Sequence, residues 1–117
     1  MKYIKQKSNK NIISDCLADL RKWDYKVFNF NQKNRFGSGL VGFTDYLIIG
    51  KGMIVFVECK IGKDKFSDEQ LGTRKSILYA AERNPFIFYC TITENNYSDF
   101  FTDVTMKNIK NLKVKYI

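Results

Sequence analysis

The sequence predicts an α/β fold in which a mixed four-stranded β-sheet is flanked by helices. Two short runs rich in Ile, Val, Phe and Tyr, 45–50 and 53–60, are joined by Gly50-Lys51-Gly52, which is a β-hairpin signal. Apolar residues recur at helical spacing both before and after this hairpin. A further apolar run, 86–92, follows the second helical segment, and a strand–helix–strand crossover makes its two strands parallel.

The first helix is expected over residues 9–23, with Ser8 as its N-cap. Residues 25–30 alternate in polarity and predict a first strand, whereas the lysine-rich residues 1–7 suggest an arm or a short strand. Residues 31–44 contain three glycines and no steady period, so we expect a loop there. Such a loop either grips a substrate or is a flexible connector.

The second helix is expected over residues 68–82. Ser67 has the character of an N-cap, and Gln70 stands three residues further on, as in a capping box. Residues 61–66 form a basic loop before it. In the tail, 97–117, apolar residues up to Ile109 predict a short helix, and the alternation from Leu112 to Ile117 predicts a strand.

The composition is that of one folded domain spanning residues 1–117. Hydrophobic residues make up 44% of the 117 and aromatic residues 15%, which suffices for a packed core. No apolar run has membrane-spanning length and no secretory signal is recognisable, so we expect no membrane partner. Cys16, Cys59 and Cys90 lie in apolar patterns without Cys-x-x-Cys spacing, and we expect buried thiols in a cytoplasmic protein.

The absence of histidine narrows the possible chemistry. It excludes His-based triads and imidazole-built zinc sites, so any general acid or base is a carboxylate, lysine, tyrosine, cysteine or water. The remaining hard-metal ligands are oxygens, which favour Mg²⁺ or Mn²⁺. The net charge of +8 fits a polyanionic partner such as nucleic acid, or simple solubility.

The hairpin carries the chain's most informative cluster of charges. If Lys51-Gly52 is a two-residue turn, Asp45 lies opposite Glu58, and Glu58 shares a strand face with Lys60. Like charges directly across a ladder are destabilising, and a cation between them would remove that cost. The alternative is an exposed hairpin end with a surface ion pair.

This stretch resembles the PD-(D/E)xK nucleases, and among them the VRR-NUC group. The matching features, within a similarity over residues 10–92, are Asp45, the glycine-turned hairpin, Glu58-Cys59-Lys60, a basic loop with Lys63 and Lys65, and Gln70 at the start of a helix. Thr44 stands where the family usually has proline. The resemblance implies a restriction-endonuclease-like αβββαβ core and a metal-dependent endonuclease that hydrolyses DNA phosphodiester bonds.

The resemblance also implies roles for individual residues. Asp45, Glu58, Lys60 and Gln70 would be catalytic, and Asp45, Glu58 and the backbone carbonyl of Cys59 would bind Mg²⁺ or Mn²⁺. Lys60 would orient or help deprotonate the attacking water, or neutralise the transition state. Gln70 would hold a water, a role compatible with its capping box.

The family usually adds an acidic residue from the first helix, and this chain departs from that pattern. The matching position is Asn9 or Ile13, depending on the register. Asp15 and Asp19 lie beside the apolar stripe, where solvation is expected, and this leaves Asp15 as the remaining candidate metal ligand. The departure keeps open an alternative, a catalytically weak or inactive nucleic-acid-binding module on the same fold.

Basic and polar residues flank the proposed site and would contact DNA phosphates, which position a duplex without reading its sequence; they are Lys33, Arg35, Ser38, Lys63, Lys65, Arg74 and Lys75. Small stand-alone members of the resembled family look like Holliday-junction resolvases, which implies a homodimer acting on branched DNA and fits a phage or mobile-element origin. Gly37-Ser38-Gly39 is similar to a loop of archaeal resolvases. The tail aromatics, Tyr97, Phe100, Phe101 and Tyr116, either join a dimer interface or cover their own core.

Overall fold

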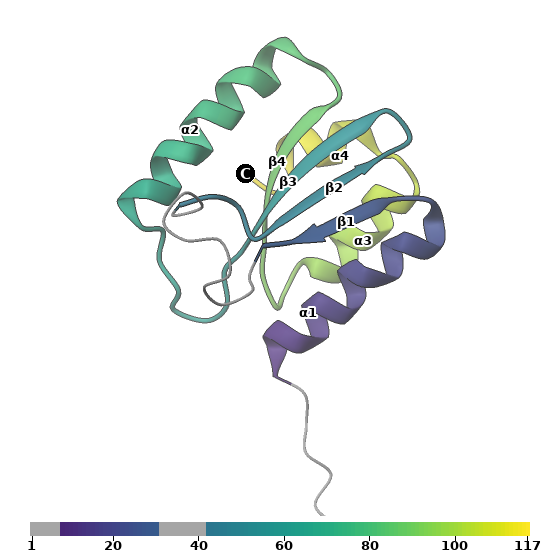
Figure 1. Cartoon of the computed structure of the whole chain (residues 1–117), viewed down its shortest axis with the longest axis horizontal. Coiled ribbons are helices and arrows are strands. Elements are labelled where there is room, and N and C mark those ends of the chain that lie inside the picture. Colours follow the sequence, from purple (N-terminus) through teal and green to yellow (C-terminus); the bar gives the residue numbers. More distant parts are fainter. Residues whose placement is uncertain (1–7, 31–41) are drawn as a thin grey trace, which may run out of the picture.

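The structure of the protein, a computed structural model, describes residues 8–30 and 42–117. Figure 1 shows a twisted sheet with helices around it. The elements follow in the order α1 (Asn9–Ala18), the 3₁₀ helix η1 (Asp19–Trp23), β1 (Lys26–Asn29), β2 (Tyr46–Gly50), β3 (Met53–Cys59), α2 (Asp68–Arg83), β4 (Ile87–Ile92), α3 (Tyr97–Thr105) and α4 (Ile109–Val114). The expectations for residues 1–7 and for most of the loop after β1 lie outside the described residues.

The four strands form one sheet in the order β1-β2-β3-β4. The first three strands pair antiparallel, and β3 pairs parallel with β4 across the α2 crossover. This confirms the predicted α/β fold with a mixed four-stranded sheet and flanking helices. The hairpin register is also as predicted, because Gly50 pairs with Met53. Lys51 and Gly52 have φ values of 51° and 82°, as a type I′ turn requires.

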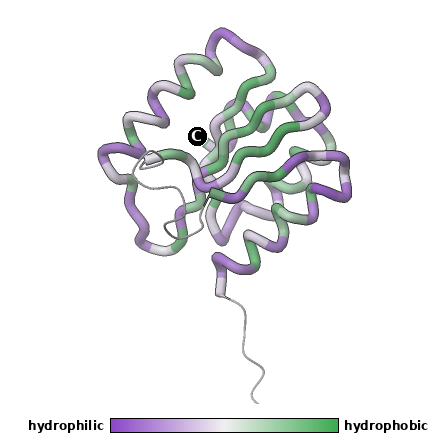
Figure 2. The backbone as a smooth tube through the Cα atoms, in the orientation of Figure 1, coloured by the Kyte–Doolittle hydropathy of each residue, from purple (hydrophilic) through white to green (hydrophobic). Residues whose placement is uncertain are grey.

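The core lies between one face of the sheet and the helices α1, α3 and α4. It contains the alternate residues Met53, Val55 and Val57 of β3, together with Ile13 and Leu17 of α1. Figure 2 shows hydrophobic residues running along the central strands, with hydrophilic residues gathered on the helices and turns. The predicted helix over residues 9–23 is present, with its last turn tightened to 3₁₀.

Helix α2 covers the opposite face of the sheet and packs mainly on β4. Apolar side chains line a groove between helix and sheet, namely Ile54, Phe56 and Ile87 of the strands and Ile77 and Ala80 of the helix. The far end of α2 is fastened by Lys113, whose ammonium donates to the carbonyls of Ala81, Asn84 and Ile87. This face of the sheet carries the candidate site, at the end nearest the start of α2.

The predicted strand over residues 112–117 is wrong, because Ile109–Val114 is the helix α4. Leu112 and Tyr116 stand four residues apart and both are buried, which is a helical spacing. Val114, which alternation would have buried together with Leu112 and Tyr116, is 65% exposed. The backbone of Tyr116 still reaches the sheet, since its carbonyl accepts a hydrogen bond from Thr91 N–H over 2.6 Å.

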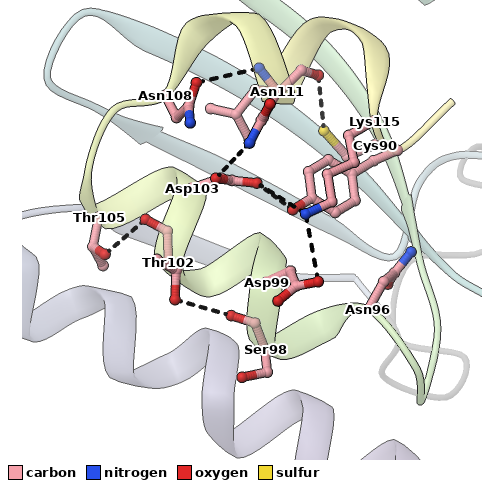
Figure 3. A network of polar contacts seen from close by, with 12 residues as sticks. Cys90, Asn96, Ser98, Asp99, Thr102, Asp103, Thr105, Asn108, Asn111 and Lys115 are labelled. Atoms are coloured by element: carbon pink, nitrogen blue, oxygen red, sulfur yellow. Dashed lines mark hydrogen bonds and ion pairs between the residues drawn. The ribbon is translucent and has the colours of Figure 1, made fainter.

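A buried polar network holds α3 against α4 (Figure 3). Asp103 is 6% exposed and accepts hydrogen bonds from the Tyr116 hydroxyl and from Asn111 Nδ2. Lys115 reaches Asp99 over 3.4 Å. Burial, and then the hydrogen bond with Asp103, raises the pKa of Tyr116, so this phenol stays neutral.

The four tail aromatics cover the core of their own chain. Phe100 and Tyr116 are buried and their rings meet edge to face at a centroid distance of 5.5 Å. Tyr97 and Phe101 are partly buried and pack against the same core. Of the two uses considered for these side chains, the structure therefore supports the packing role.

Candidate active site on the hairpin

Asp45 and Glu58 face each other at the open end of the β2–β3 hairpin. Tyr46 pairs with Val57, so the register places Asp45 opposite Glu58 at the next position. Asp45 Oδ2 accepts a hydrogen bond from the backbone N–H of Cys59 over 2.9 Å. The Asp45 carbonyl accepts from Phe30 N–H over 2.8 Å, which ties this end of β2 to β1 as well.

The chain enters β2 through a tightly packed turn at Gly42. Its φ is +80°, and a Cβ atom there would lie 2.5 Å from Glu69 Cβ. A side chain at this position would therefore collide with the first turn of α2. Thr44, in the position of the family's usual proline, is 1% exposed, and its hydroxyl donates to the Tyr46 carbonyl over 3.2 Å. These contacts fix the backbone immediately before Asp45.

Glu58 is a buried carboxyl group, only 2% exposed. Its pKa is raised to about 8, first by burial, then by the negative charge of Asp45 and by a hydrogen bond between the two carboxyl groups. The positive charge of Lys60 opposes this rise in pKa without cancelling it. A pKa of about 8 favours the protonated form of Glu58 at neutral pH.

Gln70 connects Glu58, near the end of β3, with Lys60, which directly follows that strand. Its Nε2 donates to Glu58 Oε1 over 2.9 Å, and its Oε1 accepts from Lys60 Nζ over 2.8 Å. The same Oε1 accepts from Ser67 N–H, while Ser67 Oγ accepts from Gln70 N–H, which completes the predicted capping box of α2. The capping contact and the contact with the site therefore occur together.

Lys60 is held by three contacts at once. Besides Gln70, its ammonium donates to the Lys65 carbonyl over 3.0 Å and lies 4.9 Å from the centre of the Phe66 ring. Lys60 and Glu58 both meet Gln70, so they project from the same face of β3, as the alternation of the strand predicted. The basic loop thus curls back to fix the cation beside the carboxyl pair.

Cys59 contributes its backbone and not its thiol. Burial, followed by the charge of Asp45, raises the pKa of the thiol to about 12, so it remains protonated at neutral pH. Its N–H holds Asp45, as described above. The use of its backbone carbonyl as a metal ligand stays a prediction.

The first helix brings no acidic residue to this cluster. Asn9 is exposed, Ile13 is fully buried, and Asp19 forms an exposed ion pair with Lys22. Asp15 is exposed on α1. Over residues 8–30 and 42–117, no three or more Asp, Glu or Cys side chains gather closely enough to hold a metal. Asp15 as a ligand therefore stays a prediction.

The predicted phosphate-contacting residues fall into three groups. Lys63 and Lys65 are exposed in the loop before α2, and Lys75 is exposed near the middle of that helix. Arg74 is half-buried, with its guanidinium 5.8 Å from the centre of the Tyr89 ring, so it points over the sheet. The remaining three, Lys33, Arg35 and Ser38, lie outside the described residues.

Two residues beside the site were missed by sequence reasoning. Thr91 of β4 pairs with Glu58, and Tyr89 pairs with Phe56, so both project from the face that carries the carboxyl pair. The available signal was the polar character of alternate positions, 89 and 91, inside the otherwise apolar run 86–92. These two positions can be assigned to the neighbourhood of Glu58 only once the parallel register of β3 and β4 is known.

Comparisons with protein-family models, with curated proteins and with solved structures returned no significant match to this chain. Across the part of the chain that the structure describes, no helix is both long and apolar enough to cross a membrane. A function for this chain is therefore inferred from the geometry of the site and from the motif that the sequence resembles.

Proposed function

We propose that this chain is a metal-dependent DNA endonuclease with a restriction-endonuclease-like core, related to the VRR-NUC group of PD-(D/E)xK nucleases. The observation that carries the proposal is the convergence of Asp45, Glu58, Lys60 and Gln70 through direct contacts. These residues come from three elements separated in sequence. A surface ion pair at a hairpin end would require neither the burial of Glu58 nor its bridge to α2.

The donor set suits Mg²⁺ or Mn²⁺. Asp45 raises the pKa of the facing Glu58 carboxyl group, so a divalent cation between them would balance the negative charge that this pair carries once Glu58 is ionised. Mg²⁺ needs only one or two carboxylates beside waters and substrate phosphates. Asp45 and Glu58 would hold the ion, with the Cys59 carbonyl as a third ligand. When bound, the ion lowers the pKa of a water and stabilises charge on the phosphate.

The residues themselves would perform three tasks. The Cys59 N–H and Gln70 orient the two carboxylates by binding one oxygen of each. Lys60, fixed by Gln70 and the Lys65 carbonyl, supplies a positive charge for the attacking water or for a phosphate oxygen. Lys63, Lys65 and Lys75 supply exposed cations for the phosphate backbone.

A second candidate function is a nucleic-acid-binding module without activity. It is favoured by one observation, namely that the carboxyl pair has no third acidic partner among residues 8–30 and 42–117. Such a module would bind DNA with the same basic surface and would not need Lys60. The two candidates therefore differ in whether the wild-type protein cleaves the DNA that it binds when Mg²⁺ is present.

The test is cleavage of plasmid and branched DNA with and without Mg²⁺, for wild-type protein and for Glu58→Ala, Lys60→Ala and Lys110→Ala. We expect the first two variants to lose cleavage while they retain their fold and most DNA affinity, because affinity comes from dispersed cations. Lys110→Ala is the control for loss of a lysine, because Lys110 is exposed on α4 away from the site, and it should keep cleavage. Near-normal cleavage by Lys60→Ala refutes the assignment, and DNA binding without cleavage by the wild type supports the inactive module.

A further inference from the structure

Two buried hydroxyl groups on β4 lie next to the candidate site and take no part in the contacts described above. Tyr89 is 2% exposed, and among the described residues neither its phenol O–H nor the Thr91 hydroxyl has a hydrogen-bond partner. A buried hydroxyl left unpaired costs about 1–3 kcal/mol. Two of them side by side therefore indicate a polar ligand between the sheet and α2.

The strand register places both hydroxyls beside Glu58. In the parallel β3–β4 pair, Glu58 faces Thr91, and Phe56 faces Tyr89, so all four side chains project toward α2. The charge of Glu58, after burial, is the second cause that raises the pKa of Tyr89, so the phenol lies within electrostatic reach of that carboxyl group. Thr91 lies close enough to the phenol to influence it, but without hydrogen-bond geometry.

Helix α2 closes this region from the other side. Arg74 follows Gln70 by one turn, so the two share a helix face. Gln70 contacts Glu58, and Arg74 lies over the Tyr89 ring. Further along, the same interface is apolar, lined by Ile54, Ile77 and Ile87. The polar groups thus gather only at the Glu58 end.

We propose that Tyr89 and Thr91 are positioning residues whose hydroxyls hold one internal water against the Glu58 carboxyl group. Two hydroxyls and one carboxyl oxygen give that water three partners, the usual number for a buried water. Tyr89 is too buried to touch a substrate. Gln70 fixes Glu58 from the helix side, and the water fixes it from the β4 side.

The proposal deepens the proposed function and depends on it in one respect, that Glu58 is a metal ligand. Carboxylates that bind metals are themselves hydrogen-bonded by surrounding groups, and loss of such a partner typically lowers metal affinity or activity by about 10- to 100-fold. Tyr89 and Thr91 should therefore influence metal binding although neither is itself a ligand.

The test uses Tyr89→Phe and Thr91→Val, which remove the hydroxyls and preserve shape. Tyr25→Phe is the matched control, because its buried phenol donates to the Val104 carbonyl over 2.9 Å on the opposite face of the sheet. A high-resolution crystal structure of the metal-free wild type should show a water bonded to both hydroxyls, and Tyr89→Phe should lose it. Calorimetry should give Mn²⁺ affinity about 10-fold weaker for Tyr89→Phe and unchanged for Tyr25→Phe.

The outcomes separate this proposal from the one on which it builds. A metal-free wild-type structure without the water, or unchanged Mn²⁺ affinity in Tyr89→Phe, overturns the inference and leaves the nuclease proposal standing. If the wild type binds no Mn²⁺, the proposed function fails, and the water is then judged from the crystal structure alone. Loss of stability in all three variants with no selective loss of Mn²⁺ affinity would assign Tyr89 to packing only.

Discussion

Gln70 donates a hydrogen bond from its side-chain Nε2 to Glu58 Oε1 over 2.9 Å. Since the same side chain accepts a bond from Lys60 and completes the capping box of α2, one residue links the helix start to both charged groups of the site. A movement of α2 relative to β3 would therefore displace Glu58 and Lys60 together. The cap and the bridge can be separated by mutation.

Replacing Gln70 with Ala removes the bridge, and replacing Ser67 with Ala removes only the cap. We expect Gln70→Ala to lower the cleavage rate by about 10-fold or more, because it frees Glu58 and Lys60 to move. Ser67→Ala should cost about 1 kcal/mol of stability, measured by urea unfolding, and leave cleavage close to wild type. Equal loss of cleavage in both variants would show that Gln70 acts only through helix stability.

The stability of the metal-free protein should fall as the pH rises from about 5 to 8. Glu58 has a folded pKa of about 8 against an ordinary value of 4.5, so the folded state binds the proton more tightly. That contribution is complete below pH 4.5 and is lost as the pH rises through 8. Glu58→Gln mimics the protonated group and should be more stable than wild type at pH 9, by up to about 5 kcal/mol for a pKa raised from 4.5 to about 8.

Thermal unfolding in EDTA from pH 4 to 9 measures this effect. The control is Glu82→Gln, which changes an exposed carboxylate on α2. Curves of Tm against pH that stay parallel for wild type and Glu58→Gln would show that Glu58 carries no such proton.

Cleavage should require Mg²⁺ or Mn²⁺ and be lost in EDTA, whereas Ca²⁺ should bind without turnover because its looser geometry positions water poorly.

Calorimetry of Asp45→Asn should show weakened metal binding. Asp24→Asn is the matched control, because Asp24 lies beside Gly50 at the other end of β2. Unchanged metal affinity in Asp45→Asn would show that Asp45 is not a ligand.

Metal binding should also release a proton near pH 7, since the cation displaces the one that Glu58 holds. The heat of Mn²⁺ binding should then depend on the ionisation enthalpy of the buffer. A heat that is the same in PIPES and in Tris, two buffers with very different ionisation enthalpies, would contradict a proton held by Glu58.

The resemblance to small resolvases leads us to expect a homodimer that prefers four-way junctions to linear duplex. If each copy of the chain holds the single metal site proposed here, paired cuts in two strands require two copies, and symmetric dimers are the commonest solution. Light scattering with and without a junction, and cleavage of both substrates at equal salt, measure this. A monomer in both states that nicks linear duplex equally fast would exclude the resolvase activity and leave the nuclease activity open.

The hairpin could be predicted in detail because local chemistry determines it. A two-residue turn that accepts positive φ at Lys51 and Gly52 fixes the register, and the register fixes Asp45 opposite Glu58. The capping box at Ser67 could also be predicted from the sequence, since it depends on two residues three positions apart. In both cases the interacting groups are close in sequence.

The features that escaped prediction depend on contacts between distant elements. The tail alternates in polarity, but Leu112 and Tyr116 are also four residues apart, and the packing of α4 against β4 decides between the two periods. The position of Tyr89 and Thr91 beside Glu58 follows only from the pairing of β4 with β3. No pattern within the run 86–92 alone indicates that Glu58 lies alongside.

The hydrogen bond from Thr91 N–H to the Tyr116 carbonyl bears on how the protein should be handled in the laboratory. Among the described strands β4 lies at an edge of the sheet, and an open edge is a template for pairing with other chains. A deletion that removes Tyr116 would free that N–H and promote aggregation. A variant altered at Tyr116 that loses activity should therefore be tested for aggregation before the loss is assigned to the candidate site.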